Sequence, residues 1–187
     1  MVKLKIRKYD ELLRYELVGG IVVLKKNYIA RMREKVGHEG MIFMSAYGIL
    51  WNEQHDKILL EKRWDSDAGW GFPGGYLEYG DSPTQAVIRE FKEETGLDVE
   101  VTRVLGLSTN ITEKNSWGDA QETVGIGFEV KQIGGTLRKD GTETVDLQFV
   151  SVVPEPNMFV PQAQKTIHSV LTENEVSEKP WIREHGE

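Results

Sequence analysis

The sequence predicts an α/β or α+β sandwich, because apolar segments typical of strands alternate with segments that carry helix signals. An apolar run from Met41 to Trp51 and a strand-like segment from Lys57 to Arg63 lie on either side of a polar turn. A helix with a clear start and stop follows at about 83–95. Further strand-like segments and a closing helix continue the alternation, which is typical of a sheet covered by helices.

Residues 1–40 form a mixed segment that leans toward basic side chains, and we expect this extension to pack on the domain that begins at residue 41. Within it, the apolar run from Ile21 to Leu24 predicts a short strand. Tyr28 to Val36 predicts a helix, because Gly37 provides a C-terminal stop signal.

The helix predicted at about 83–95 has clear signals at both ends. Ser82 can cap its start, Pro83 occupies the first helical position, and Gln85 can complete a capping box with the serine. Gly96 supplies the stop, because glycine adopts the left-handed conformation that commonly ends a helix.

The second half of the chain predicts more strands and one more helix. We expect strands at 99–107, 122–131 and 145–152, and a helix from Pro161 to Leu171. The turn Lys139-Asp140-Gly141 separates the last two strands. The residues from Thr172 onward are polar, so we expect a frayed tail.

The composition excludes several classes of protein. The 187 residues suit one domain, and the absence of cysteine excludes disulfides, thiolate metal sites and cysteine nucleophiles. The 23 basic and 30 acidic side chains give a formal net charge of -7, which argues against a general nucleic-acid binder. No apolar run reaches the ~20 residues of a membrane helix, and the N-terminal segment has no apolar signal-peptide core. We therefore expect a soluble cytoplasmic protein without a membrane partner.

Three carboxylates crowd into the end of the predicted helix. Glu90, Glu93 and Glu94 are spaced so that an ideal α-helix places all of them on one face. Carboxylates this close repel one another unless a cation lies among them, and hard oxygen ligands suit Mg²⁺ or Mn²⁺. Arg89 lies four residues before Glu93 and can pair with it, which would keep this glutamate ionised at neutral pH.

A glycine pair precedes this helix. Gly74 and Gly75 let the backbone approach a ligand closely, so a carbonyl oxygen could join the coordination shell of a cation. A glutamate-rich helix by itself is more often a solvated surface. Here the glycine pair, the capping box, the arginine and the carboxylate spacing coincide in one segment, and together they favour a metal site for phosphate chemistry.

The segment from Gly75 to Leu97 resembles the Nudix box, G-x5-E-x7-R-E-U-x-E-E-x-G-U, in which U is a bulky apolar residue. The matching positions are Gly75, Arg89, Glu90, Phe91, Glu93, Glu94, Gly96 and Leu97. Asp81 is the one departure, since the family has glutamate there, and the shorter acid predicts tuned rather than lost activity. Flanking segments that also resemble the family are Arg63, Trp70-Gly71-Phe72-Pro73, Gly134-Gly135 and the region of Glu143.

The resemblance implies an α/β/α sandwich with a mixed sheet, which would occupy residues 41–172 and leave 173–187 as a polar tail. It also implies a Mg²⁺- or Mn²⁺-dependent hydrolase that cleaves the pyrophosphate linkage of a nucleoside diphosphate derivative. Such a derivative could be a nucleoside triphosphate, a nucleotide sugar or a dinucleoside polyphosphate. The expected partner is therefore a small-molecule nucleotide substrate.

The resemblance also implies a role for each site residue. The residues expected to bind the cation are Glu90, Glu93, Glu94 and, through its carbonyl, Gly74. Arg89 would orient Glu93. A general base must take a proton from the attacking water, and the first candidate is Glu93, with Glu90 second. Glu143 is the third candidate, because some relatives take the base from a loop outside the box.

Substrate choice depends on residues outside the acidic helix. The predicted substrate-binding residues are Arg63, Trp70, Phe72 and Gly75, and Trp117 is a further candidate for stacking on a base. For each aromatic side chain, packing in a loop or in the core is the alternative. Downstream subfamily markers are missing, since no tyrosine follows Tyr79 and the next proline after the box is Pro154. These absences weaken the assignment to a dinucleoside polyphosphate or ADP-ribose subfamily.

Two alternative functions and one hypothesis of assembly stay open. A Nudix fold can serve as a nucleotide sensor without turnover, although the acidic positions of the box are kept here. The protein could also hydrolyse 5′-triphosphate RNA ends with the help of Lys3, Lys5, Arg7 and Lys8, although its acidic net charge argues against this. The extension 1–40 is also a candidate interface for a homodimer.

Overall fold

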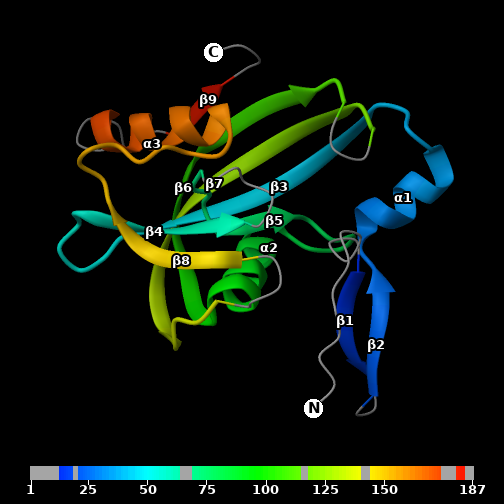
Figure 1. The fold of residues 1–187 in the computed structure, drawn as a ribbon, viewed down its shortest axis with the longest axis horizontal. Coiled ribbons are helices and arrows are strands. Elements are labelled where there is room, and N and C mark those ends of the chain that lie inside the picture. The colour runs from blue at the N-terminus through cyan, green and yellow to red at the C-terminus, as the bar shows by residue number, and fades with distance from the viewer. Residues whose placement is uncertain are drawn as a thin grey trace.

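The computed structural model describes residues 13–18, 21–63, 69–114, 118–139, 144–173 and 180–183. Figure 1 shows the elements along the chain. In order they are β1 (Leu13–Val18), β2 (Ile21–Lys26), α1 (Tyr28–Val36), β3 (Met41–Leu50), β4 (Lys57–Arg63), β5 (Gly74–Tyr76), α2 (Pro83–Glu90), β6 (Leu97–Thr112), β7 (Gln121–Gly135), β8 (Thr144–Ser151), α3 (Pro161–Glu173) and β9 (Trp181–Arg183). A π-helical turn, Phe91–Thr95, continues α2.

A mixed sheet with the strand order β5-β3-β7-β6-β9 forms the centre of the described fold. β3 runs parallel to β7, whereas β6 runs antiparallel to β7 and parallel to β9. In Figure 1, α2 lies on one side of this sheet and α3 on the other. β4 pairs with β8, and β1 pairs with β2 in a separate two-stranded hairpin. The predicted α/β/α sandwich with a mixed sheet is confirmed.

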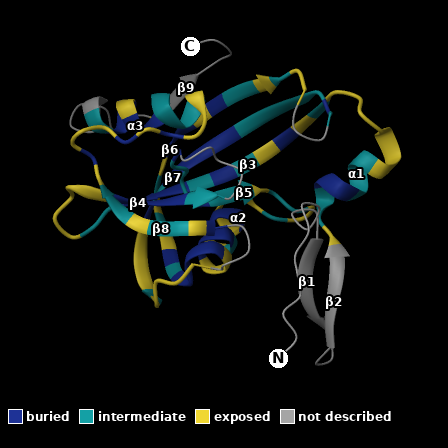
Figure 2. Ribbon diagram, in the orientation of Figure 1, coloured by how far each residue is buried: buried dark blue, intermediate teal, exposed yellow. Residues whose placement is uncertain are grey.

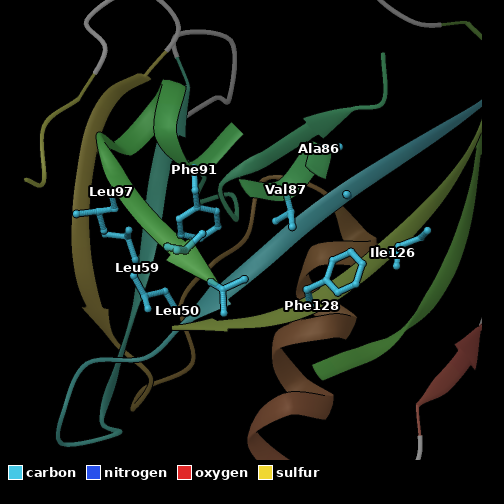
Figure 3. Packing of buried hydrophobic residues seen from close by; sticks show 11 residues of the cluster. Leu50, Leu59, Ala86, Val87, Phe91, Leu97, Ile126 and Phe128 are labelled. Atoms are coloured by element: carbon cyan, nitrogen blue, oxygen red, sulfur yellow. The ribbon is translucent and has the colours of Figure 1, made fainter. Parts of the chain in front are cut away.

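The face of the sheet under α2 carries a close-packed apolar core. Val87 and Phe91 are fully buried there and pack in one cluster with sheet residues such as Phe128 (Figure 3). Gly48 of β3 leaves the space that the Phe91 ring occupies, because a Cβ atom at this glycine would lie 2.5 Å from Cε2 of the ring. Figure 2 shows that buried residues concentrate along α2 and the central strands. A second buried cluster, on the side of α3, contains Ile49, Leu60, Leu105, Ile167 and Val170.

Most predicted elements are present near their predicted bounds. The helix expected at 28–36 is α1, and Gly37 follows it with a positive φ of 69°. The strands expected at 99–107 and 122–131 are longer than predicted, because β6 and β7 form an antiparallel pair that continues past the end of β3. The closing helix α3 continues two residues beyond the predicted Leu171.

The expected frayed tail is wrong for Trp181–Arg183. These residues form β9, which pairs with Gly106–Ser108 of β6. The outer edge of β6 offers unpaired backbone groups, and a short strand can pair with them whatever its side chains are. A polar composition therefore does not reveal this pairing. The turn predicted at Lys139-Asp140-Gly141 lies partly in 140–143, outside the described residues.

The packing of Phe91 leads to the first prediction. Phe91→Ala removes a fully buried ring that Gly48 accommodates, and we expect it to lower the free energy of unfolding by about 3–5 kcal/mol. Ile88→Ala is the matched control, because Ile88 lies in the same helix but is 39% exposed. It should change the free energy by less than about 1 kcal/mol. Urea unfolding followed by circular dichroism measures both, and equal effects would contradict the described packing.

Candidate active site

The start of α2 is fixed by a capping box. Gln85 donates its backbone N–H to Ser82 Oγ at 3.2 Å, and Ser82 donates its own N–H to Gln85 Oε1 at 2.9 Å. Pro83 occupies the first turn, where its missing N–H costs nothing. Ala86 and Val87 are fully buried in the apolar cluster with sheet residues, so this face of the helix lies toward the sheet. Its last residue, Glu90, therefore reaches the short strand β5, beside Gly75.

The π-helical turn Phe91–Thr95 changes how the three glutamates are presented. A π-helical turn holds more residues than an α-helical turn. Residue i+4 therefore points in nearly the same direction as residue i, whereas residue i+3 points to a different side of the helix. Glu90 and Glu94 are accordingly both 6% exposed, whereas the Glu93 side chain is 51% exposed. The predicted common face thus holds for Glu90 and Glu94, but Glu93 points toward solvent.

Arg89 bonds to groups from four parts of the site. Its Nη1 lies 2.6 Å from Glu90 Oε1 and 3.4 Å from Glu93 Oε2. Its Nη2 and Nε donate to Asp81 Oδ2 at 3.1 and 3.3 Å, and Nη2 also donates to the Tyr76 carbonyl. The expected pairing with Glu93 is present, but Glu90 is the closer partner. Burial alone would lower the pKa of Arg89, but the charges of Glu90 and Glu93 raise it, so the guanidinium stays charged.

Glu94 lies against the glycine turn and close to a second buried carboxylate. Gly74 donates its N–H to Glu94 Oε2 at 2.9 Å. Burial raises the pKa of Glu94 well above its usual range, and the charges of Glu61 and Glu90 raise it further. The Gly74 N–H and the charge of Arg63 act in the opposite direction. A carboxyl group that is so hard to ionise is stabilised as a carboxylate by any cation that binds beside it.

Glu61 is a site residue that the sequence reasoning missed. It lies in β4 and is 2% exposed, and Thr144 of β8 donates its hydroxyl to Glu61 Oε2 at 2.7 Å. The only available signal was a glutamate inside the strand Lys57–Arg63, where a buried apolar residue would be ordinary. Its partner could not be identified, because Thr144 is far away in the sequence.

Both glycines of the turn are required by close contacts. A Cβ atom at Gly75 would lie 2.7 Å from Glu90 Oε1, so only glycine lets this carboxylate rest against the backbone. Gly74 has a φ of +153°, and a Cβ atom there would lie 2.6 Å from Tyr47 Cα. The glycine pair therefore determines where Glu90 and Glu94 sit.

The carboxylates of Glu90, Glu93 and Glu94 are the type of ligand that a divalent cation prefers, but the structure does not hold them as a complete set of metal ligands. Glu90 and Glu94 are hard oxygen donors, and they lie close enough that the charge of Glu90 raises the pKa of Glu94. Across the part of the chain that the structure describes, however, no three His, Asp or Glu side chains converge closely enough to hold a metal ion. A cation bound by all three box glutamates would require Glu93 to turn inward.

The predicted substrate residues have defined surroundings. Arg63 lies at the end of β4, where its charge acts on Glu94. Lys62 Nζ lies 4.5 Å from the centre of the Trp70 ring. Phe72 stacks on Tyr47 with ring centres 5.5 Å apart, and both Trp70 and Phe72 pack against the second apolar cluster. Each aromatic ring thus has a packing role, while Trp117 and Glu143 lie outside the described residues.

Comparison with known proteins identifies the family. The family model of the NUDIX domain matches residues 41–170. A Bacillus subtilis (strain 168) protein provisionally named 8-oxo-dGTP diphosphatase is 33% identical over 128 residues, which cover 68% of this chain and 79% of that protein. The ADP-ribose pyrophosphatase of Methanocaldococcus jannaschii is 33% identical over 108 residues, which cover 57% of this chain and 61% of that protein.

Solved structures agree with the family match. An ADP-ribose pyrophosphatase from Streptococcus suis superposes with a TM-score of 0.55 at 26% identity, covering 76% of this chain and 98% of that one. A NUDIX hydrolase from Nitrosomonas europaea shares the fold, with a TM-score of 0.63 at 16% identity over 92% of this chain and 93% of that one. The chain therefore belongs to the Nudix family. By class it is a hydrolase.

Among the residues that the structure describes, none of the helices has both the length and the apolar character that crossing a bilayer requires.

The contact between Gly75 and Glu90 leads to a second prediction. Gly75→Ala places a methyl group 2.7 Å from Glu90 Oε1, so the carboxylate must move away from the turn. We expect a loss of about 1–3 kcal/mol in the free energy of unfolding, because the site is closely packed. Gly40→Ala is the control, since its Cβ would meet its nearest neighbour at an ordinary 3.8 Å. Urea unfolding compares the two variants, and an unchanged Gly75→Ala protein would contradict the described contact.

Proposed function

We propose that the protein is a Mg²⁺- or Mn²⁺-dependent pyrophosphohydrolase that cleaves the pyrophosphate linkage of a nucleoside diphosphate derivative. The observation that carries the proposal is the pair of buried carboxylates beside the glycine turn: Glu94 accepts the N–H of Gly74, and Glu90 is bonded by Arg89. Buried groups of like charge favour a bound cation, and a cation binds phosphates. The relatives named for 8-oxo-dGTP and ADP-ribose support the substrate class, because both compounds are nucleoside diphosphate derivatives.

The proposed site assigns a role to each acidic residue. Glu90, Glu93 and Glu94 would hold the cation, with the Gly74 carbonyl as a further candidate ligand. When bound, the cation screens the charge of the diphosphate and makes a water molecule easier to deprotonate. Arg89 orients Glu90 and Glu93 through its Nη1 contacts.

Glu93 is the first candidate for the general base. Its side chain is 51% exposed and therefore accessible to water, while Arg89 holds it near the buried carboxylates. As water attacks phosphorus, the carboxylate would accept the proton and the second phosphate would leave. Glu90 is the second candidate, although it is more buried. Glu143 stays the third, from a segment outside the described residues.

The substrate would approach from the side of the glycine turn. Arg63 is the candidate for binding phosphate, because a guanidinium pairs well with phosphate oxygens. Gly75 would contribute by holding the Glu90 carboxylate, and with it a bound cation, at the turn where the phosphate binds. Trp70 and Phe72 would stack on a base only through ring surface that the contacts with Lys62, Tyr47 and the second apolar cluster leave open.

The organisation of the chain around the site is also proposed. Residues 41–172 would form the catalytic domain, which the family match at 41–170 supports. The extension 1–40 would pack on it, and 173–187 would follow as a C-terminal segment. A cytoplasmic location and a homodimer built on the extension stay predictions. Light scattering coupled to size-exclusion chromatography would test the dimer.

The third prediction tests the proposed activity. Glu90→Gln, Glu93→Gln and Glu94→Gln each remove one carboxylate charge, and we expect each to lower kcat/KM by about a hundredfold or more. The assay measures release of phosphate or nucleoside monophosphate from a nucleotide panel with Mg²⁺ or Mn²⁺, and a chelator should abolish it. Glu100→Gln is the control, because this glutamate is 53% exposed on β6, outside the proposed site.

Two outcomes would count against the proposed activity. If the wild type and Glu93→Gln hydrolysed every substrate at the same rate, the assigned site would be wrong. If nucleotides bound without turnover at any concentration of metal, the protein would be a nucleotide sensor and not an enzyme.

A further inference from the structure

Helix α1 lies before the residues matched by the family model, yet it touches the loop of the Nudix box. Tyr28, the first residue of α1, donates its backbone N–H to Glu78 Oε1 at 3.1 Å. Arg31 Nη2 lies 3.8 Å from Glu78 Oε2. Glu78 belongs to the loop between β5 and α2, and in Figure 1 the chain after β5 extends toward the near end of α1.

The contact between Glu78 and α1 has a physical basis in the unpaired N–H groups at the start of a helix. The first N–H groups of a helix have no acceptor within the helix, and a negative charge beside them is favourable. In α1 the Asn27 side chain accepts the N–H of Ala30 at 2.9 Å, and Glu78 accepts that of Tyr28. The box loop thus supplies part of the cap of α1, and α1 in turn fixes the position of the Glu78 carboxylate.

A series of hydrogen bonds leads from Glu78 to the acidic helix. Glu78 donates its own N–H to Asp81 Oδ2 at 3.4 Å. The same oxygen accepts the bonds from Nη2 and Nε of Arg89, and Arg89 Nη1 lies 2.6 Å from Glu90 Oε1. Each bond joins neighbouring groups, so a shift of Glu78 moves the acceptor that holds the Arg89 guanidinium.

A buried ion pair holds the other part of α1. Nη2 of Arg33 lies 2.5 Å from Oδ2 of Asp119, and Nε of Arg33 donates to the same oxygen at 2.6 Å. Asp119 is 1% exposed. His38, just after the helix, lies 2.7 Å from the second oxygen of Asp119. Ala120, which follows Asp119 in the chain, accepts with its carbonyl the N–H of Met41 at the start of β3. Helix α1 is therefore fixed to the sheet and to the box loop at the same time.

We propose that α1 is a positioning element for the reaction. The bond from the N–H of Tyr28 holds the Glu78 side chain in place, and the N–H of Glu78 in turn fixes Asp81. Asp81 then orients Arg89 toward Glu90. The proposal rests on the proposed function, because Arg89 and Glu90 belong to that site. It assigns a role to residues that lie before the family domain and that the Nudix box does not include.

A pair of substitutions at Tyr28 tests the bond directly. Tyr28→Pro removes the N–H that Glu78 accepts, while proline is favoured at the first position of a helix. Asn27 has an extended ψ of 171°, which is the conformation that a following proline requires. Tyr28→Ala is the matched control, because it removes the same ring and keeps the N–H.

We expect Tyr28→Pro to have a kcat about fivefold below that of Tyr28→Ala, with KM changed by less than about twofold. In a Glu78→Ala background the two Tyr28 variants should have the same kcat, because the acceptor is gone. Glu78→Gln keeps an acceptor oxygen and should retain more activity than Glu78→Ala. If Tyr28→Pro does not fold, the comparison of Glu78→Gln with Glu78→Ala still tests whether the Glu78 acceptor oxygen supports activity.

A second readout does not depend on turnover. Amide hydrogen exchange of 77–82 in the full chain should be about fivefold faster in Tyr28→Pro than in Tyr28→Ala, while exchange in β7 stays equal. Equal kcat and equal exchange in the two Tyr28 variants would overturn the inference. If the wild type hydrolysed no nucleotide, the proposed function would fail, and the exchange of 77–82 would still decide whether α1 holds this loop.

Discussion

The Arg89 guanidinium is the contact on which the site depends most. Four segments meet at this one cation: the carbonyl of Tyr76 in β5, the carboxylate of Asp81 in the loop, Glu90 at the end of α2 and Glu93 in the π-helical turn. A positive charge that lies among acidic groups offsets their mutual repulsion. Arginine suits this role, because its planar group donates to several acceptors at once and stays charged.

Space limits the site as strictly as charge does. Gly75 leaves room for the Glu90 carboxylate, and Gly48 leaves room for the Phe91 ring that anchors the helix end. The π-helical turn then separates Glu94, which points inward, from Glu93, which faces water. One segment thus presents carboxylates in two environments, and this is a useful arrangement when some groups bind a cation and another handles a proton.

Local sequence signals predicted the parts of this site that local contacts determine. The capping box at Ser82 and the left-handed stop at Gly96 depend on neighbours a few residues away, so their spacing reveals them. The π-helical turn was not predictable, because the spacing argument assumes an ideal α-helix. The bonds of Glu61 to Thr144 and of Tyr28 to Glu78 join distant residues, and no local spacing encodes them.

The central claim is that the buried carboxylates of the Nudix box form a cation site. Titration of the full-length protein with Mn²⁺, followed by the electron paramagnetic resonance signal of free Mn²⁺, measures this without any substrate. We expect the wild type and Glu100→Gln to bind Mn²⁺ with similar affinity, and Glu94→Gln to bind at least about tenfold more weakly. Equal affinity in the wild type and Glu94→Gln, or no binding to the wild type, would contradict the account.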